Sequence, residues 1–258
     1  MMRTNHVRTK LLAGKPTLGT WMTLSSATSA RVLARAGFDW LTVDMEHSFQ
    51  SPESMAQMVA VIAESHMCAP FVRVPVNSVE WFKWALDAGA WGVIVPMVNS
   101  HAEAEQAVSW AKYPPQGTRS IGGAIAPYSF GAATWQEYAN AANDEIMVIL
   151  QIESAAGLAH LDDILSVPGV DVAFVGPNDL HAQLGLAARS ESDEPAFLSA
   201  LDQIKTAARR YNIPLGIYSS DGGVAAERIR EGFQMISIEN DLSILAKAAT
   251  QQIELARE

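Results

Sequence analysis

The stretch LTVDMEHSF, residues 41–49, joins a buried strand to a group of ionisable side chains. Its first residues are apolar or β-branched, as in a strand that is covered on both faces. Asp44, Glu46 and His47 then follow one another closely. Charge at the end of a buried strand is unfavourable unless it is paired or has a function. In α/β barrels, functional residues gather at the carboxyl ends of the strands.

Similar apolar runs recur along the whole chain and alternate with amphipathic segments. We predict strands at residues 18–24, 40–46, 70–75, 91–98, 146–153, 170–176, 213–219 and 234–240. We predict helices at 29–37, 51–65, 78–90, 101–113, 156–165, 194–211, 222–232 and 242–258. This alternation indicates a parallel α/β architecture, and eight strands close a TIM barrel. The predicted fold is therefore one (β/α)8 barrel domain over residues 1–258, with a leader or helix at 1–17. A doubly wound sheet is the alternative, although no Gly-rich phosphate-binding motif opens an early helix.

One segment interrupts this rhythm. Residues 114–133, PPQGTRSIGGAIAPYSFGAA, are rich in glycine and proline and have little hydrophobic pattern. Irregular segments of this length are uncommon in compact domains and are often functional. We expect this segment on the active-site side of the barrel, with a short strand near Ile121. In that position residues 125–130 would lie over the mouth of the site.

Composition excludes several classes of protein. The chain has 258 residues, of which 49% are hydrophobic, so it can form a large core. A net charge of −10 argues against nucleic acid or an anionic membrane as a partner. The single cysteine, Cys68, excludes disulfides and cysteine-based zinc sites within one chain and suits a reducing cytoplasm. We find no signal peptide or membrane-spanning run, and we expect a cytoplasmic protein.

Polar side chains stand at the ends of several predicted strands. They are Asp44, Glu46, His47, Arg73, Gln151, Glu153, Asn178, Asp179, Ser219, Ser220, Glu239 and Asp241. Each has a simpler structural explanation: Asp179 can cap a helix, Glu153 can favour a helix start, Arg73 can form a structural ion pair, and His47 can be an ordinary rim histidine. A functional interpretation is favoured because these side chains would converge on one small mouth.

The residue types at this mouth indicate metal-assisted enolate chemistry. Glu153 and Asp179 form an oxygen-ligand pair that suits Mg²⁺ or Mn²⁺. Arg73 can bind a carboxylate or enolate oxygen, and His47 with Asp44 provides a base and an orienting carboxylate. The lysines lie in the leader or in predicted helices, so no lysine is expected inside the barrel to form a Schiff base. The lysines are Lys10, Lys15, Lys83, Lys112, Lys205 and Lys247.

The sequence resembles the HpcH/HpaI family of metal-dependent, class II 2-oxo-acid aldolases. The resemblance spans residues 18–240 and rests on AGFDWLTVDMEH, VRVP, LDAGAWGVIVPMV, KYPPQGTRSIGG, QIES and VPGVDVAFVGPNDLHAQLG. It implies reversible cleavage of a 4-hydroxy-2-oxo acid to an aldehyde and pyruvate, or hydroxypyruvate, through a metal-stabilised enolate. It also implies a divalent ion, Mg²⁺ or Mn²⁺ with Co²⁺ as a substitute, and a homo-oligomer, commonly a hexamer that exchanges its last helix.

The resemblance assigns roles to particular residues. It gives Glu153 and Asp179 as metal ligands, and Arg73, Gln151, Asn178 and Asp179 as the pyruvate site. His47 becomes the acid or base, acting directly or through a metal-bound water. Asp44 and Asp87 would tune its basicity, and the role of Asp87, which lies in a predicted helix, comes only from the resemblance.

Two other functions remain open at this stage. VDMEH is similar to the same stretch of macrophomate synthase, which suggests an oxaloacetate decarboxylase that couples this step to carbon–carbon bond formation. The other alternative is a barrel without catalytic activity that binds a small oxo acid as a sensor.

Overall fold

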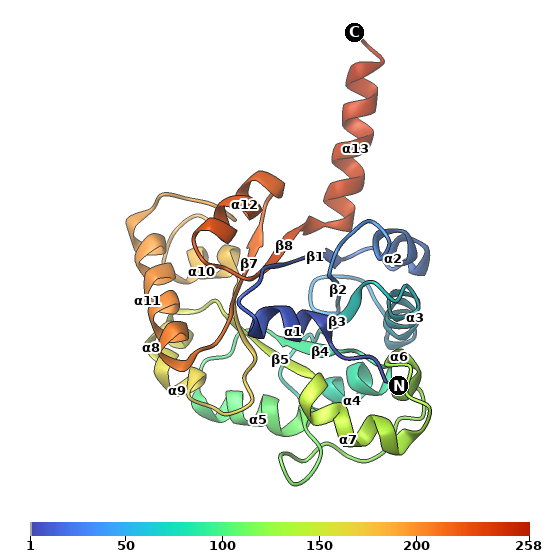
Figure 1. Cartoon of the computed structure of the whole chain (residues 1–258). Coiled ribbons are helices and arrows are strands. Elements are labelled where there is room, and N and C mark those ends of the chain that lie inside the picture. The colour runs from blue at the N-terminus through green and yellow to red at the C-terminus, as the bar shows by residue number, and fades with distance from the viewer. Residues whose placement is uncertain (1) are drawn as a thin grey trace.

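Eight parallel strands close into a barrel in the computed structural model, which describes residues 2–258 (Figure 1). The strands are β1 (Thr17–Met22), β2 (Trp40–Asp44), β3 (Ala69–Arg73), β4 (Gly92–Val95), β5 (Met147–Ile152), β6 (Val172–Val175), β7 (Leu215–Ser219) and β8 (Met235–Asn240). Each of the eight predicted barrel strands is present, with end points that differ by a few residues. Because β8 pairs with β1, the sheet has no edge, so the barrel prediction is confirmed and the doubly wound alternative is wrong.

Helices surround the strands on the outside of the barrel. They are α1 (His6–Leu12), α2 (Ala27–Leu33), α3 (Pro52–Ala63), α4 (Val79–Asp87), α5 (His101–Ala111), α6 (Ala126–Ser129), α7 (Trp135–Glu145), α8 (Ala155–Ala159), α9 (Leu161–Leu165), α10 (Pro177–Gln183), α11 (Pro195–Tyr211), α12 (Gly222–Arg230) and α13 (Asp241–Leu255). The predicted helix at 156–165 is divided at His160 into α8 and α9. None of the helices within residues 2–258 has the length and apolar character needed to cross a membrane.

The interior of the barrel is filled by side chains from alternate strand positions. Trp40 lies beside Gly19 of the neighbouring strand, where a Cβ would approach the indole ring to 2.0 Å. Trp40 also meets Phe71 edge to face, with ring centroids 6.2 Å apart. A side chain at position 19 would therefore have to displace a fully buried tryptophan, which a close-packed core resists.

Helix α1 closes the amino-terminal end of the barrel, as Figure 1 shows at the centre of the view. Asn5 caps this helix, since its side-chain oxygen accepts hydrogen bonds from the N–H groups of Val7 and Arg8. Its amide nitrogen donates to the carbonyls of Trp91 and Glu145, at 3.2 and 2.9 Å. The Asn5 side chain therefore satisfies hydrogen-bonding groups both at the amino end of α1 and at the rim of the barrel beneath it.

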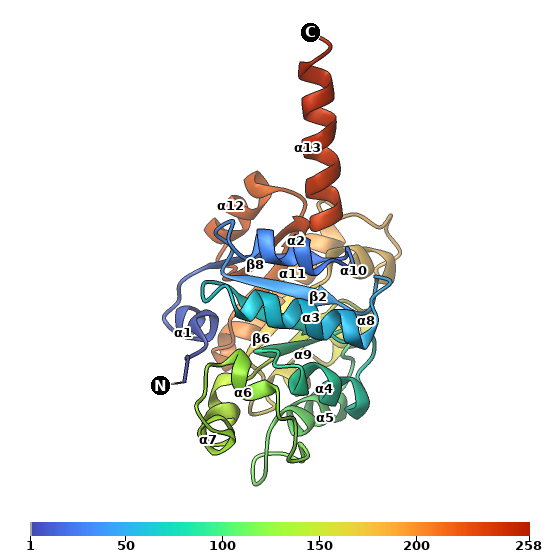
Figure 2. The same ribbon diagram turned by 90° about the vertical axis from the view of Figure 1, so that its right-hand side faces the viewer.

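The segment at 114–133 lies at this same amino-terminal end, so the prediction that it borders the active site is wrong. Ser129 donates a hydrogen bond to the carbonyl of Gly89 at 2.6 Å, and Trp91, just before β4, donates to Ser129. The backbone N–H of Arg3 donates to the carbonyl of Phe130 at 2.7 Å. In Figure 2, α6 and α7 lie on the side of α1, away from α8 and α10.

The reason is the place of the segment in the βα repeat. It follows α5, and a helix of this fold returns the chain to the amino ends of the strands. The short strand expected near Ile121 is also absent: residues 117–125 are irregular and lead into α6. Length and composition identified an unusual loop but carried no information about which end of the barrel it occupies.

Helix α13 leaves the barrel and projects away from it (Figures 1 and 2). Its first residue, Asp241, is buried and accepts hydrogen bonds from the N–H and hydroxyl of Thr23 and from the N–H of Leu24. Beyond this anchor the helix exposes its apolar side chains: Leu242, Leu245, Ile253 and Leu255 are each more than half exposed. The helix therefore does not pack its apolar residues on its own barrel.

Candidate active site

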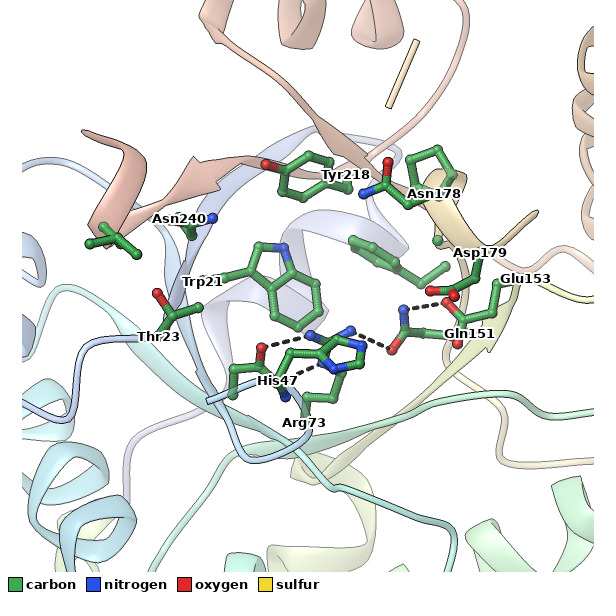
Figure 3. A pocket seen from close by; sticks show the side chains of 15 residues that line it. Trp21, Thr23, His47, Arg73, Gln151, Glu153, Asn178, Asp179, Tyr218 and Asn240 are labelled. Carbon is green, nitrogen blue, oxygen red and sulfur yellow. Dashed lines mark hydrogen bonds and ion pairs between the residues drawn. The ribbon is translucent and has the colours of Figure 1, made fainter. Parts of the chain in front are cut away.

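A cavity of about 320 Å³ opens at the carboxyl ends of the strands (Figure 3). It is lined by Trp21, Thr23, Asp44, His47, Arg73, Gln151, Glu153, Phe174, Gly176, Pro177, Asn178, Asp179, Tyr218, Asn240 and Leu242. The structure thus brings together Asp44, His47, Arg73, Gln151, Glu153, Asn178 and Asp179 from separate parts of the chain. No residue of the 114–133 segment lines the cavity.

Arg73 is held from several sides at the floor of the cavity. Its Nε and Nη2 donate to the two carboxylate oxygens of Asp44 at 2.8 and 2.6 Å, and its Nη1 lies 3.0 Å from Glu46. The guanidinium also lies over the ring of Trp21, 4.4 Å from its centroid. Burial alone would lower the pKa of Arg73, but the bonds to Asp44 and the nearby carboxylates outweigh it and raise the pKa. Arg73 is therefore a fixed cation.

Asp44 organises the turn that carries His47. Its Oδ1 accepts hydrogen bonds from the backbone N–H groups of Glu46 and His47, at 3.1 and 3.4 Å, and its carbonyl accepts one from the hydroxyl of Ser48. The carboxylate therefore fixes the backbone of His47 and makes no ion pair with its imidazole in the described structure. The imidazole is instead 3.7 Å from Glu46, measured from Nε2 to Oε2.

Glu153 is a buried carboxylate on the opposite side of the cavity. It accepts hydrogen bonds from the N–H of Met97 at 2.9 Å and from the amide of Gln151 at 2.8 Å. Burial is the main reason that the pKa of Glu153 rises to about 8; the Met97 bond and Arg73 oppose the rise, while Glu46 and Asp179 add to it. Below that pH the side chain holds a proton unless a cation stands beside it.

Gly176 makes room for this carboxylate. It ends β6 just before α10, and a Cβ at this position would lie only 1.8 Å from Oε2 of Glu153. The first turn of α10 then presents Asn178 and Asp179 to the cavity, with Asp179 next to Glu153 in Figure 3. The missing side chain at 176 is what allows two carboxylates from β5 and α10 to approach each other.

These two carboxylates suit a divalent cation. A buried glutamate whose pKa is raised by burial and by neighbouring carboxylates is the group that a bound cation would stabilise as an anion. Within residues 2–258 no cluster of three or more His, Cys, Asp or Glu side chains has metal-binding geometry. Two carboxylates with further oxygen ligands from water or substrate are the arrangement that Mg²⁺ commonly uses.

Asp87 does not reach the cavity within one chain. It ends α4 at the amino-terminal side of the barrel, where its carboxylate pairs with Arg119 at 3.3 Å. Arg119 is in turn buried against the rings of Tyr113 and Tyr138. The prediction that Asp87 tunes His47 is therefore wrong for a single chain, because α4 carries it away from the carboxyl ends of the strands.

The remaining wall of the cavity is formed by residues that the sequence did not single out. Trp21 and Tyr218 are strand residues that line the cavity, Thr23 follows β1, Asn240 ends β8, and Leu242 lies in the first turn of α13 (Figure 3). Burial, with help from Glu239 and Glu191, raises the pKa of Tyr218, so its phenol stays protonated. These uncharged side chains form what we call the neutral wall. They are missed when only ionisable residues at strand ends are considered. Their one available signal is that Trp21 and Tyr218 lie near the ends of their predicted strands.

Comparison with known proteins identifies the family of this chain. The family model described as HpcH/HpaI aldolase/citrate lyase matches residues 17–248. The chain belongs to the HpcH/HpaI aldolase family. The chain is 36% identical over 253 residues to a hydroxypyruvate/pyruvate aldolase of Rhizorhabdus wittichii, covering 98% of this chain and 99% of the relative. It is 35% identical to a 4-hydroxy-2-oxo-heptane-1,7-dioate aldolase of Escherichia coli, over 95% of this chain and 92% of the relative.

A solved structure agrees with this assignment. An HpcH/HpaI aldolase/citrate lyase family protein from Burkholderia cenocepacia superposes with a TM-score of 0.91 at 33% identity, covering 99% of this chain and 100% of the other. The relatives carry the names of aldolases, which are lyases. This family member is therefore an enzyme of the lyase class.

We expect Gly176→Ala to disable the cavity without unfolding the barrel. The added methyl would displace the carboxylate of Glu153, so activity should fall by at least about 100-fold, the loss typical of misplacing a catalytic group. Gly222→Ala is the matched control, since a Cβ there meets nothing within 4 Å. Steady-state rates and thermal melting of both variants test this. Wild-type rates for Gly176→Ala would show that Glu153 is not required.

Proposed function

We propose that this protein is a class II aldolase that cleaves a 4-hydroxy-2-oxo acid reversibly into pyruvate and an aldehyde. The observation that carries the proposal is the joint placement of Arg73, His47, Glu153 and Asp179 around one cavity of about 320 Å³. A fixed cation, an imidazole and a pair of carboxylates are the groups that enolate chemistry needs. Membership of the aldolase family supports the same reaction.

The chain's own residues account for binding and proton transfer. Arg73, held flat by Asp44 and Trp21, binds the carboxylate or oxo oxygen of the substrate and stabilises the negative charge that develops there. Gln151 and Asn178 line the same side and position the oxo acid. His47 removes the proton of the 4-hydroxyl, the C3–C4 bond breaks, and the aldehyde leaves. The enolate then takes one proton at C3, which balances the proton lost.

Glu153 and Asp179 would hold a divalent cation, Mg²⁺ or Mn²⁺. When bound, the cation supplies positive charge close to the oxo acid and so favours the enolate.

Chelation should abolish activity and Mn²⁺ should restore it. Because the pKa of Glu153 is about 8, its carboxyl holds a proton at pH 7 and must lose it when a cation binds. Calorimetry in buffers of different ionisation enthalpy should therefore show release of about one proton per Mn²⁺ at pH 7 and close to none at pH 9. Affinity for Mn²⁺ should accordingly rise with pH until about 8 and then level off.

The matched variants are Glu153→Gln and Asp179→Asn, which should lose Mn²⁺ binding and activity, and Asp163→Asn, an exposed carboxylate elsewhere, which should lose neither. Full turnover by the chelated wild-type protein would contradict the proposal.

The uncharged side chains of the neutral wall indicate which aldehyde the enzyme would accept. Arg73 is the only lysine or arginine among the described residues that line the cavity, and the proposed reaction already uses it to bind the oxo acid. Thr23, Tyr218 and Asn240 can hydrogen-bond a hydroxyl group but cannot pair with a carboxylate. A carboxylate that loses water without gaining a partner is strongly disfavoured. We therefore propose a short neutral or hydroxylated aldehyde as the partner of pyruvate or hydroxypyruvate.

We expect kcat/KM for glyceraldehyde to be at least about tenfold higher than kcat/KM for succinic semialdehyde, a difference of ~1.4 kcal/mol. The comparison is made at one fixed pyruvate concentration with Mn²⁺ present. An advantage for the semialdehyde would show that the neutral wall does not set the preference.

The same cavity fits decarboxylation of oxaloacetate, which also passes through a pyruvate enolate. That reaction needs Arg73 and the carboxylate pair but no removal of a 4-hydroxyl proton. Oxaloacetate decarboxylation is therefore a second candidate activity of the same site. Comparing it with the aldol reaction distinguishes the role of Arg73, which both reactions need, from that of His47, which only the aldol reaction needs.

We also propose a homo-oligomer in which α13 is exchanged between subunits, with a hexamer as the assembly that the family resemblance implies. The supporting observation is the projecting helix and the adjacent apolar groove of about 300 Å³, lined by Leu24, Val32 and Leu33 together with Ile244, Leu245 and Ala248 of α13. Burial of such a face on a second subunit would remove several large apolar side chains from water.

Light scattering after gel filtration should give a multiple of the 27.8 kDa chain mass. Leu245→Glu combined with Ile253→Glu should produce smaller species, because both side chains are exposed in one chain and would be buried in an exchanged pair. Gln252→Glu, an exposed polar position on the same helix, is the control. A monomeric wild-type protein would refute helix exchange.

A further inference from the structure

Glu46 lies between the two groups to which the proposed reaction assigns charge and proton transfer. Its Oε2 is 3.0 Å from Nη1 of Arg73 and 3.7 Å from Nε2 of His47. The glutamate side chain is only 17% exposed, whereas that of His47 is 63% exposed. An exposed imidazole at the rim thus has one buried carboxylate beside it.

Asp44, a carboxylate that the family resemblance assigns to His47, is bound by Arg73 through both of its oxygens and makes no contact with the imidazole in the described structure. Its Oδ1 accepts from Nε of Arg73 and from the N–H groups of Glu46 and His47, and its Oδ2 accepts from Nη2 of Arg73. Among the described residues, Glu46 is the carboxylate that pairs with the His47 ring. We infer that Glu46 is the residue that positions the imidazole of His47 and sets its tautomer for proton transfer.

The position of Glu46 determines which ring nitrogen of His47 accepts the proton. A carboxylate beside Nε2 favours the tautomer with hydrogen on Nε2, which leaves Nδ1 free to accept a proton. An exposed imidazole without such a partner would occupy several rotamers and both tautomers. Glu46 is therefore a positioning residue that acts through His47.

The groups around Glu46 act on its charge in opposite directions, and the net effect is a raised pKa. Burial is the largest influence and raises the pKa of Glu46, while Arg73 on β3 and the neighbouring His47 lower it. Asp44 on β2 and Asp179 on α10 raise it further, and Glu46 in turn raises the pKa of Glu153, which follows β5. Arg73 is the one permanent cation in this group, so the contact at 3.0 Å favours the charged form of the glutamate and holds it in place.

Glu46→Gln removes the charge of this side chain while keeping its shape. In the glutamate, Oε2 makes both contacts. In the glutamine the amide oxygen still accepts from Arg73, which Asp44 also holds, so the oxyanion partner stays in place. The neutral amide no longer holds hydrogen on Nε2 of His47. This inference rests on the proposed aldolase function, and decarboxylation of oxaloacetate serves as the internal reference because it needs no base at the 4-hydroxyl.

Both reactions are measured with Mn²⁺ for the wild type, Glu46→Gln, His47→Ala and the double variant. We expect Glu46→Gln to lower aldol kcat by at least about 100-fold, as loss of the correct histidine tautomer does in other enzymes. The rate of oxaloacetate decarboxylation should stay within about threefold of the wild type. In the aldol reaction, the losses caused by Glu46→Gln and His47→Ala should be non-additive. Glu46→Asp should recover part of the aldol rate. Equal losses in both reactions, or additive losses, would overturn the inference.

A readout without turnover tests the tautomer directly. Nitrogen NMR of the His47 ring at a fixed alkaline pH should show hydrogen mainly on Nε2 in the wild type and a mixture of both tautomers in Glu46→Gln. Unchanged ring nitrogens would overturn the inference. If the wild type proves inactive as an aldolase, the proposed function fails and this measurement still decides the role of Glu46.

The matched control is the exposed His101–Glu105 pair on α5, 3.3 Å apart and remote from the cavity. Glu105→Gln should change neither reaction. Thermal melting of each variant checks that the fold is retained. A loss of aldol rate in Glu105→Gln equal to that of Glu46→Gln would overturn the inference.

Discussion

The paired contact between Arg73 and Asp44 is the constraint on which the cavity depends. It joins the carboxyl ends of β2 and β3, and both side chains are largely buried, with 12% and 2% of their surface exposed. Burying such a pair has a desolvation cost, and removing one partner typically costs ~3–5 kcal/mol because the other charge is left alone. The pair is therefore poor evidence of added stability, and its value lies in fixing geometry. One of these oxygens, Oδ1 of Asp44, also holds the backbone of the turn that carries Glu46 and His47.

From this pair the cavity divides into a charged side and a neutral side. Glu153 and Asp179 stand together because Gly176 has no side chain, and their mutual repulsion, added to burial, raises the pKa of Glu153. Trp21 connects the two sides, since its ring face lies against Arg73 and its Nε1 donates to Ser237 at 2.9 Å. The function that we propose would use the charged side for enolate chemistry and the neutral side for selecting the aldehyde, both on one surface at the strand ends.

Two errors of interpretation have one physical origin. Composition and resemblance predict residues 114–133 and Asp87 at the active site, yet within one chain both lie at the amino-terminal end of the barrel. Asp87 ends a helix and 114–133 follows one, and helices return the chain to that end. Position within the βα repeat is the information that would have corrected both assignments. Residues that directly follow strands, such as His47 and Glu153, were placed correctly for the same reason.

The sequence by itself determined the barrel, its eight strands and the charged residues at their ends, because continuous apolar runs and helical periodicity are local properties. It also indicated the aldolase family through motifs distributed along the chain. Only the tertiary structure decided which carboxylate faces His47, since Asp44 and Glu46 both stand within three residues of it and differ in their contacts with Arg73 and with the ring. The room that Gly176 leaves for Glu153, the neutral wall around Tyr218 and the projecting direction of α13 depend likewise on contacts between distant segments. Such contacts are set by packing across the closed barrel, and no local pattern encodes them.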